Sequence, residues 1–318
     1  MANLIVDDEI DLTLYERETD AKQCVKPAAV YVQELIDRIS NPVLEKRALM
    51  PWAKTHGQIA FRPGEVTVWG GPNGSGKSLI LGQVALSLCA QGYRTCIASF
   101  EMKPVKSLER MGRQWTKTNP SDPLVLSDSH ERDIMLDLFG QFRDWTDKQM
   151  WIYDRQGTVD WIRVCAVARY CAKELGISHF IIDNLMKCVQ GEDDYNGQKG
   201  FVDALTAIAR DHAIHVHLVH HIKKPATEDS LPGKYDFKGT GAITDQVDNA
   251  IVVWRNKRKE RDRQAGKPVS ISEPDAKLLV DKQRNGEGWE GVIGLWYHAH
   301  TQQFLAGESH KPMTFYGA

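Results

Sequence analysis

The strongest constraint on the fold lies in residues 71–78, Gly-Pro-Asn-Gly-Ser-Gly-Lys-Ser, which match the pattern G-x-x-x-x-G-K-[ST]. An apolar segment that favours a strand, Glu65–Trp69, precedes this motif, and a helical pattern, Leu79–Ala90, follows it. In such a strand–loop–helix unit, glycines let backbone N–H groups approach phosphate oxygens, and the helix N-terminus adds partial positive charge. The motif therefore predicts a nucleotide-phosphate site that comprises Gly71, Pro72, Asn73, Gly74, Ser75, Gly76, Lys77, Ser78 and Leu79.

Four side chains around this loop carry the expected chemistry. Lys77 is expected to bind the β and γ phosphates of ATP, and the Ser78 hydroxyl to ligate Mg²⁺. Asp183 ends the apolar strand Phe180-Ile-Ile-Asp and suits the Mg²⁺ shell, through Ser78 or water; an Asp that caps the strand end is the alternative. Glu101 ends the strand after the loop's helix, where a carboxylate can orient the attacking water; a surface Glu is the alternative.

Downstream, strand and helix patterns alternate, which indicates an α/β fold with a mainly parallel sheet covered on both faces. Further helices are expected at Trp161–Leu175 and Gly200–Asp211. Further strands are expected at Thr95–Phe100, His179–Ile182, Ile214–His220, Ala250–Trp254, Ala276–Val280 and Gly291–Tyr297.

The first fifty residues differ from the rest and are expected to form an arm and linker helix, while residues 51–318 form the ATPase domain. Residues 1–25 are polar and acidic and are expected to be poorly ordered. Residues 27–40 predict a short amphipathic helix with apolar positions at helical spacing. Because an isolated helix of this length is marginally stable, it needs a surface to pack against, in its own domain or in a neighbour's.

Composition excludes several classes of protein. No apolar run approaches the length of a membrane span, and the acidic N-terminus lacks the pattern of a signal or transit peptide, so a cytoplasmic location and no membrane partner are expected. The six cysteines show no C-x-x-C spacing and are expected to be buried, reduced thiols. Since the net charge is −2, any nucleic-acid binding must come from local basic segments.

Four histidines crowd one strand and its end, His215, His217, His220 and His221. Strand alternation would place His215, His217 and His221 on one face. A zinc site is disfavoured because no H-E-x-x-H motif is present and no carboxylate or Cys stands at ligand spacing. A polar group at the strand end that contacts the γ-phosphate, and reports it to the loop beginning at Lys223 and Lys224, is the simpler interpretation.

Two other basic segments leave alternatives open. The run Arg255–Arg263 is either a solvated loop or a segment attracted to a phosphate backbone. Lys282 and Arg284 alternate onto one face near a late strand end, far in sequence from the phosphate-binding loop. They are either surface cations or fingers supplied in trans to the γ-phosphate of a neighbouring copy.

Taken together, these motifs resemble one family. The segments that carry the resemblance, from Pro63 to Phe304, are "RPGEVTVWGGPNGSGKS", "SFEMKP", "HFIIDNL", "LVHHIKKP", "FKGTGAITDQVDNAIVVWRN" and "DKQRNG". In this order and spacing, they resemble the ring-shaped DnaB-like replicative helicases, which have a RecA-like core. They are most similar to the helicase half of phage primase-helicases and of mitochondrial Twinkle.

The resemblance implies a role for each matching residue. Lys77 and Ser78 match the phosphate-loop Lys and metal ligand, Glu101 the catalytic glutamate, Asp183 the second-strand aspartate and His221 the γ-phosphate sensor. Lys223 and Lys224 match a DNA-binding loop of the central channel, and Lys238 and Gly239 a glycine-rich segment near it. Residues 191–199 match the other channel loop, where three acidic residues argue against direct phosphate contact. Arg255 and Tyr297 match residues that sandwich the base, and Lys282 and Arg284 the pair that reaches across the subunit interface.

The implied protein is an ATP-dependent replicative DNA helicase of RecA-like fold, a ring, hexameric in the family, that moves along single-stranded DNA with 5′→3′ polarity. ATP and Mg²⁺ are the implied cofactors, and a separate primase or other replisome proteins are implied partners. The phage relatives carry a primase module before the helicase core and the bacterial ones an N-terminal helical domain; neither is expected in these 318 residues, although the 27–40 helix matches the position of the family's linker helix, which packs on the adjacent subunit. A RecA-like recombinase and a helicase-derived accessory ATPase without unwinding activity are the alternatives.

Overall fold

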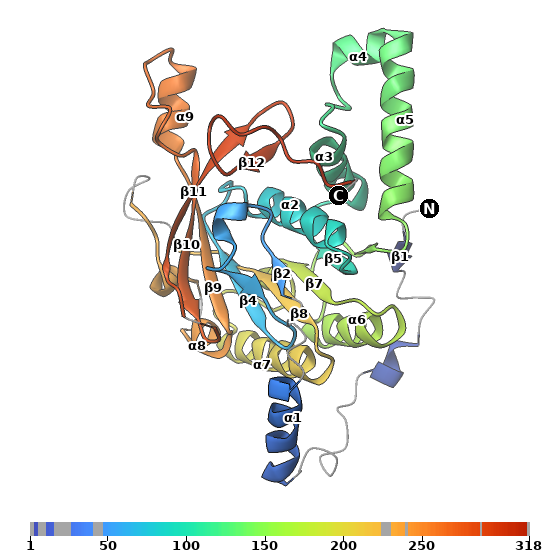
Figure 1. Ribbon diagram of the computed structural model, residues 1–318, viewed down its shortest axis with the longest axis vertical. Helices are drawn as coiled ribbons and strands as arrows, with labels where there is room; N and C mark the ends of the chain where they lie inside the picture. The colour runs from blue at the N-terminus through green and yellow to red at the C-terminus, as the bar shows by residue number, and fades with distance from the viewer. Residues whose placement is uncertain are drawn as a thin grey trace.

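A ten-stranded sheet runs through the computed structural model (Figure 1), which describes residues 3–5, 11–15, 27–40, 47–223, 230–238, 241–286 and 288–316. The strand order is β1-β6-β5-β7-β8-β4-β9-β10-β11-β12. In this order, the neighbours from β1 to β9 pair in parallel, and β10, β11 and β12 add an antiparallel edge. The strands are β1 Asn3–Ile5, β4 Val66–Gly70, β5 Thr95–Ser99, β6 Met150–Tyr153, β7 His179–Asp183, β8 His215–Val219, β9 Asn249–Arg255, β10 Ala276–Gln283, β11 Gly291–His298 and β12 Gln303–Leu305.

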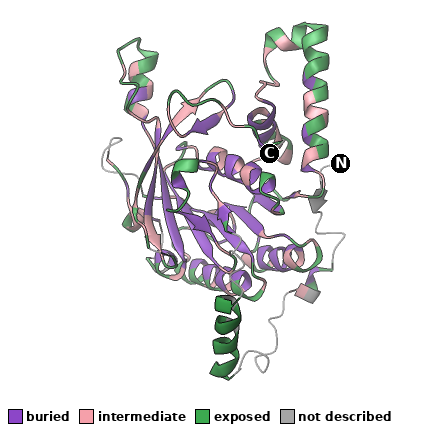
Figure 2. Cartoon of the chain, viewed as in Figure 1, coloured by how far each residue is buried: buried purple, intermediate pink, exposed green. Residues whose placement is uncertain are grey.

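Helices cover both faces of this sheet, as Figure 2 shows by the buried strands between them. The helices α6, Trp161–Glu174, and α7, Tyr195–Asp211, pack on one face, and α2, Lys77–Ala90, and α3, Pro104–Thr116, pack on the other. Successive residues of β9 enter the two cores in turn, which is why its sequence is largely apolar. The predicted α/β fold with a mainly parallel sheet is confirmed.

The remaining elements lie around this core. Helix α1 spans Ala28–Ser40, α4 Pro123–Ser127, α5 Ser129–Thr146, α8 Ala242–Gln246 and α9 Lys257–Gln264, and a small ladder pairs β2, Ala48–Leu49, with β3, Ala60–Phe61. Two aspartates set the starts of α4 and α5, because Asp122 accepts a hydrogen bond from the N–H of Leu124, and Asp128 from those of His130 and Glu131. In Figure 1, α4 and α5 form a projecting arm at the top, and α1 projects at the opposite end.

The elements expected from the sequence are present, with shifted ends. Helix α7 starts at Tyr195 rather than Gly200, because Asp194 caps it by accepting from the N–H of Gly197 at 2.9 Å. The basic run that follows β9 is the helix α9 rather than a solvated loop; Asn256 caps it by accepting from the N–H of Lys259. The helices α3 to α5 and the strand β6 were not predicted.

The expectation of a poorly ordered arm over residues 1–25 is wrong for the segments that the structure describes. Strand β1 pairs with β6, and Leu12 is buried against the core. The Tyr15 hydroxyl donates to Glu174 at 3.0 Å, and Arg169 donates to the Tyr15 carbonyl at 3.0 Å. These described segments are therefore attached to the sheet edge and to α6.

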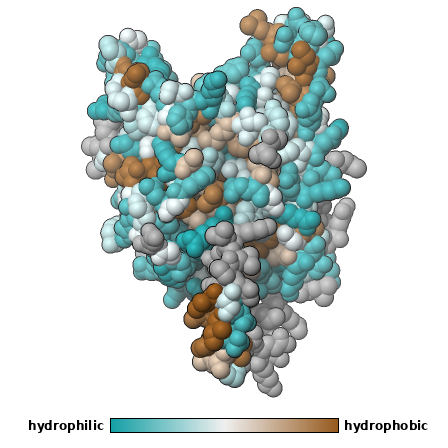
Figure 3. Space-filling view, viewed as in Figure 1, coloured by the Kyte–Doolittle hydropathy of each residue, from teal (hydrophilic) through white to brown (hydrophobic). Residues whose placement is uncertain are grey.

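Helix α1 has the predicted amphipathic sequence, but its apolar side is not covered by the described part of the chain. Its large apolar side chains are all exposed, up to 70 % at Ile39; they are Val30, Tyr31, Val32, Leu35, Ile36 and Ile39. Figure 3 shows them as a hydrophobic patch at the lower end of the molecule. The helix thus requires a surface from outside these residues.

Two expectations from composition can be compared with the described residues. Cys89, Cys96, Cys165, Cys171 and Cys188 are buried and form no disulfide, as predicted, and Cys24 lies outside the described residues. Within the described ranges, none of the helices has the length and apolar character needed to cross a bilayer.

Candidate nucleotide-binding site

The phosphate-binding loop, residues 71–78, joins the end of β4 to the start of α2. Gly76, immediately before the helix, has φ of 93°, in the left-handed region that favours glycine. At Gly71, an added Cβ would lie 2.6 Å from the Ser75 Oγ and 2.7 Å from the Val253 carbonyl oxygen. The loop can therefore wrap closely only with glycine at these positions.

Lys77 is held inside the loop. Its Nζ donates to the carbonyl oxygens of Gly71 at 2.7 Å and Pro72 at 3.0 Å. Burial lowers the pKa of Lys77 to about 8, against the opposing attraction of Asp183 and Glu101. The ammonium group is therefore short of compensating negative charge, which favours an anionic ligand.

Ser78 and Asp183 meet where α2 begins and β7 ends. The Ser78 hydroxyl donates to Asp183 Oδ2 at 2.5 Å. Burial raises the pKa of Asp183, and the hydrogen bond from Ser78 opposes this rise. A hydroxyl and a carboxylate in contact fit Mg²⁺, which takes few protein ligands and completes its shell with water and phosphate. In the described ranges no group of three His, Cys, Asp or Glu forms a metal cluster, so a site made by protein alone is not found.

Glu101 and His221 lie beside this pair and share one partner, Asn184. The Asn184 Nδ2 is 2.8 Å from Glu101 Oε1 and 3.2 Å from His221 Nε2. Burial and the nearby Lys77 lower the pKa of His221, so its ring is neutral at pH 7. Sequence reasoning missed Asn184, although its place directly after Asp183 at a parallel strand end was a usable signal.

One cavity of about 490 Å³ brings these groups together. Its lining includes most of the predicted residues and two that were not predicted, Arg110 and Gln302. The predicted residues in the lining are Asn73, Gly74, Ser75, Gly76, Lys77, Ser78, Leu79, Glu101, Asp183, His221, Arg255 and Tyr297. Gly71 and Pro72 support it through their contacts with Lys77.

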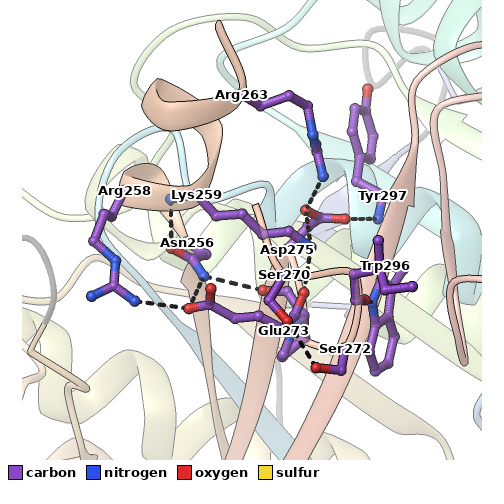
Figure 4. Close-up of polar contacts among 12 residues, drawn as sticks. Asn256, Arg258, Lys259, Arg263, Ser270, Ser272, Glu273, Asp275, Trp296 and Tyr297 are labelled. Atoms are coloured by element: carbon purple, nitrogen blue, oxygen red, sulfur yellow. Dashed lines mark hydrogen bonds and ion pairs between the residues drawn. The ribbon is translucent and has the colours of Figure 1, made fainter. Parts of the chain in front are cut away.

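The ends of β9 and β11 supply Arg255 and Tyr297, which lie at one end of the cavity. Arg255 donates to the Gly74 carbonyl at 3.2 Å and pairs with Glu260 at 2.6 Å, and the Tyr297 ring lies 5.2 Å from that of Phe304. A polar network below α9 fixes this end (Figure 4), because Asp275 accepts from the Tyr297 N–H and pairs with Lys259 and Arg263.

The same network forms ion pairs with the basic run Arg255–Arg263. Arg258 pairs with Glu273 at 2.9 Å, and Lys259 pairs with Asp275 at 3.1 Å although its own side chain is almost fully buried. Together with the pairs of Arg255 and Arg263, these contacts neutralise much of the run. The run therefore supports the wall of the cavity, and contact with a phosphate backbone stays a prediction.

Lys282 and Arg284 lie at the amino ends of the parallel strands, opposite to the ends that carry the phosphate-binding loop. Gln283 pairs with Asn249 at the start of β9, whereas β4, which leads into the phosphate-binding loop, ends at Gly70 opposite Val252. The three residue steps from Asn249 to Val252 span roughly 10 Å along the strand, and the loop lies beyond them. Lys282 Nζ donates to the Thr244 carbonyl at 2.6 Å, and Arg284 pairs with Asp248 at 3.3 Å, so neither reaches the cavity of its own chain.

The comparisons with known proteins agree with this arrangement. Residues 55–306, which are well over half of the chain, match the family described as the DnaB-like helicase C-terminal domain. The chain belongs to this family. As a DnaB-like ATPase domain, it binds and hydrolyses nucleotide, and the cavity at the phosphate-binding loop is the candidate site.

Solved structures share the DnaB-like fold at low sequence identity. One of them, an ATPase domain, matches with a TM-score of 0.69 and 14 % identity, over 91 % of this chain and 99 % of that one. A DnaB-like replicative helicase, solved in a study of its interactions with primase, matches with a TM-score of 0.69 and 15 % identity, over 91 % of this chain and 67 % of that one. At these identities the matches show the fold alone.

In this DnaB-like domain, an isolated antiparallel bridge joins residues 221–223, after β8, to residues 236–238, and this pair of segments is called the hairpin below. Ile222 pairs with Phe237, the Lys223 N–H donates to the Asp236 carbonyl at 2.6 Å, and the Lys238 N–H donates to the His221 carbonyl at 3.0 Å. The Lys223 side chain is exposed. Lys224 and Gly239 lie outside the described residues. The hairpin thus connects His221 directly to Lys238.

The histidines divide between different environments, because β8 ends at Val219. His215, His217 and His179 of β7 are buried side by side, with His179 Nδ1 3.2 Å from His217 Nε2. His221 is in the cavity instead, so the expectation that it shares a face with His215 and His217 does not hold. Among the described residues, no group of three or more His, Cys, Asp or Glu is placed to hold a metal ion.

Proposed function

We propose that this chain is the motor of an ATP-dependent DNA helicase, which works as a ring of copies on single-stranded DNA and hydrolyses ATP between adjacent copies. The observation that carries the proposal is the position of Lys77 and Arg284 at opposite ends of the parallel strands. A site that needs both cations must take them from two copies.

One copy supplies the phosphate-binding half of the site. Lys77 neutralises phosphate charge, and the α2 N-terminus directs its N–H groups at the same anion. Ser78 and Asp183 would hold Mg²⁺, which would offset the charge of the phosphates. Glu101 accepts a hydrogen bond at its Oε1, and its carboxylate, exposed beside the cavity, orients the attacking water.

The next copy supplies the second half. Lys282 and Arg284 are held by backbone carbonyls of residues 244–245, which orient the two side chains near the sheet edge. A guanidinium group brought to the γ-phosphate offsets the charge that develops during phosphoryl transfer. A single copy therefore contains an incomplete site and is expected to hydrolyse ATP slowly.

The uncovered face of α1 supports contact between copies. Its exposed apolar residues need a surface, and in the family that the chain resembles a linker helix packs on the adjacent subunit. Burying this face would join neighbours through a connection that is separate from the nucleotide site. We propose six copies in the ring, as in the family.

The hairpin after β8 is the proposed DNA contact. Lys223, Lys224 and Lys238 supply cations to it, and His221 lies at its base in the cavity. Loss of the γ-phosphate contact at His221 would move the hairpin and shift its hold on the DNA backbone. Because the contact is electrostatic, binding should tolerate any sequence and weaken with salt.

The decisive experiment mixes two inactive variants. Lys77→Ala and Arg284→Ala are each expected to lower ATP hydrolysis by at least about 100-fold. In a mixed ring, an Arg284→Ala copy keeps its phosphate-binding loop and receives Arg284 from a Lys77→Ala neighbour, so activity should return at that interface. Full turnover by Arg284→Ala alone would remove the claim that the site is shared.

A forked duplex distinguishes helicase activity from the alternatives. The proposal expects ATP-dependent displacement of one strand, with 5′→3′ movement and with rings visible by mass measurement. Homologous strand pairing without displacement would indicate a recombinase, and assembly on DNA without either activity would indicate an accessory ATPase. A separately encoded primase is the proposed partner, to be tested by co-purification.

A further inference from the structure

We propose that Asn184 is a positioning residue that couples the catalytic Glu101 to the sensor His221, so that the state of the sensor sets the orientation of the glutamate. This inference rests on the proposed function, since it assigns the link between two residues of the same site. It concerns one amide nitrogen and its two hydrogen-bond partners.

The geometry places Asn184 between the two functional side chains. It directly follows Asp183 at the end of β7, and the residue is fully buried, with 0 % exposure. The same Nδ2 lies 2.8 Å from Glu101 Oε1 and 3.2 Å from His221 Nε2. Since an amide nitrogen carries two hydrogens, it can donate to both partners at once.

The chemistry of the partners fixes the direction of both bonds. An ionised carboxylate only accepts, so the nitrogen of the amide must face Glu101. The same nitrogen can then only donate to His221, so His221 Nε2 presents its lone pair and the ring proton is on Nδ1. This Nδ1 is buried and has no hydrogen-bond partner in the described part of the chain.

Among the described residues, the side chain of Asn184 makes no further hydrogen bond that the fold would need. Its Oδ1 is buried without a partner among the described residues, and its main-chain oxygen accepts from the Lys187 N–H at 3.1 Å. The two side-chain bonds therefore go only to residues of the catalytic site. A buried amide with an unpaired oxygen is costly, which argues that its two donated bonds serve the site.

The coupling follows from these bonds. To donate to a γ-phosphate through Nε2, His221 must carry a hydrogen there; the ring takes this proton from water at Nε2 and returns its Nδ1 proton to water, so it stays neutral. The new hydrogen faces the Asn184 amide, and the His221–Asn184 bond breaks. The amide, now bonded to Glu101 alone, turns and brings the carboxylate to the attacking water, so loss of Asn184 removes this orientation.

The test compares Asn184→Ala and Asn184→Leu, of which the second keeps the side-chain volume. Both are expected to lower kcat at least about tenfold, with binding of a non-hydrolysable ATP analogue changed less than about threefold. Adding His221→Ala to either variant should produce little further loss, because the two residues act through one link. Ser99→Ala is the matched control, since Ser99 ends the adjacent strand, pairs with Asp183 in register and has a buried hydroxyl without a partner among the described residues.

The measured kcat values and the folding of the variants decide whether Asn184 couples Glu101 to His221. Full kcat in Asn184→Leu, or losses that add fully with His221→Ala, would overturn the coupling while leaving the proposed function intact. Failure of both variants to fold, measured by circular dichroism, would make Asn184 a structural residue and also overturn it. Failure of the proposed function is recognised separately, by full ATP hydrolysis in Lys77→Ala.

Discussion

Glu192 and Lys238 form an ion pair that joins the segment before α7 to the hairpin after β8. Both side chains are partly exposed, 58 % for Glu192 and 30 % for Lys238. Such a pair contributes about 0–1 kcal/mol, so a DNA phosphate can replace the carboxylate. An acidic loop, residues 191–199, can therefore lie at the proposed DNA surface, because its Glu192 holds the cation of Lys238 in place.

The Glu192→Gln variant is therefore expected to bind single-stranded DNA more tightly, by about two- to fivefold, because Lys238 no longer has a competing carboxylate. Lys238→Ala should weaken binding and make the salt slope shallower by about 0.7. Fluorescence anisotropy over a range of salt concentrations measures both effects. Asp193→Asn removes an adjacent exposed charge; an equal gain there would show that net charge, and not the pair, is responsible.

Nucleotide affinity should depend on pH through Lys77. Its pKa is lowered to about 8, and a bound triphosphate favours the charged form and raises this pKa. Affinity should therefore be constant below pH 8 and fall above it, by at most about tenfold per pH unit. Titration calorimetry with a non-hydrolysable ATP analogue from about pH 7 to about 9.5 measures this, and Lys77→Met should remove the dependence. A flat profile in the unsubstituted protein contradicts the prediction.

The buried histidines predict loss of stability in acid. Burial lowers the pKa of His179, His215 and His217, to about 4 for His215. Above about pH 6.5 the folded and unfolded forms are both neutral; below it, the unfolded chain binds protons that the folded chain excludes. The free energy of unfolding should therefore fall between about pH 6.5 and 4, by about 1.4 kcal/mol per pH unit for each such histidine.

Urea denaturation at about pH 7.5, 6.5 and 5.5 tests this expectation. His217→Asn should give a smaller dependence on pH, whatever its effect at the highest pH. His310→Asn, at an exposed histidine, should leave the dependence as it is. Equal slopes in all three proteins would show that the buried cluster is not the source.

The apolar side of α1 predicts an assembly defect without a folding defect. Leu35→Glu and Ile39→Glu replace exposed side chains, so thermal unfolding of the single copy should change little. Ring formation and DNA-stimulated ATP hydrolysis should both fall strongly, because a charge would have to be buried between copies. Mass photometry with ATP and DNA measures assembly, and Gln33→Glu on the polar side is the control. Normal rings in Leu35→Glu would show that α1 packs elsewhere.

Sequence reasoning could predict the sheet and most of the cavity because their signals are local. The phosphate-binding loop needs glycines within eight positions, and the strand that ends in Asp183 is apolar over residues 180–182. Once the strands are parallel, their carboxyl ends meet at one edge, so Lys77, Glu101 and Asp183 converge without further information.

The parts that could not be predicted depend on contacts distant in sequence. The position of Asn184 after Asp183 indicates that it lies near the site, but its two partners, Glu101 and His221, come from other strand ends. The helices α3 to α5, in contrast, carry local signals that were missed: a proline at the start of α3 and aspartate caps at α4 and α5. The pairing of β1 with β6 joins segments that are far apart in the chain. The ion pairs of α9 arise from Glu273 and Asp275, which the basic run itself does not reveal.

If the site is shared between copies as proposed, the separation of Lys77 from Arg284 also sets the direction in which copies can be added. A two-fold pair buries the same patch on both partners. It would therefore have to bring the Lys77 end of each copy against the Arg284 end of the other at the same time. Only a head-to-tail series presents the front of each copy to the back of the next. Such a series ends either by closing on itself or by growing without limit, and one defective copy in it impairs two neighbouring pockets at most.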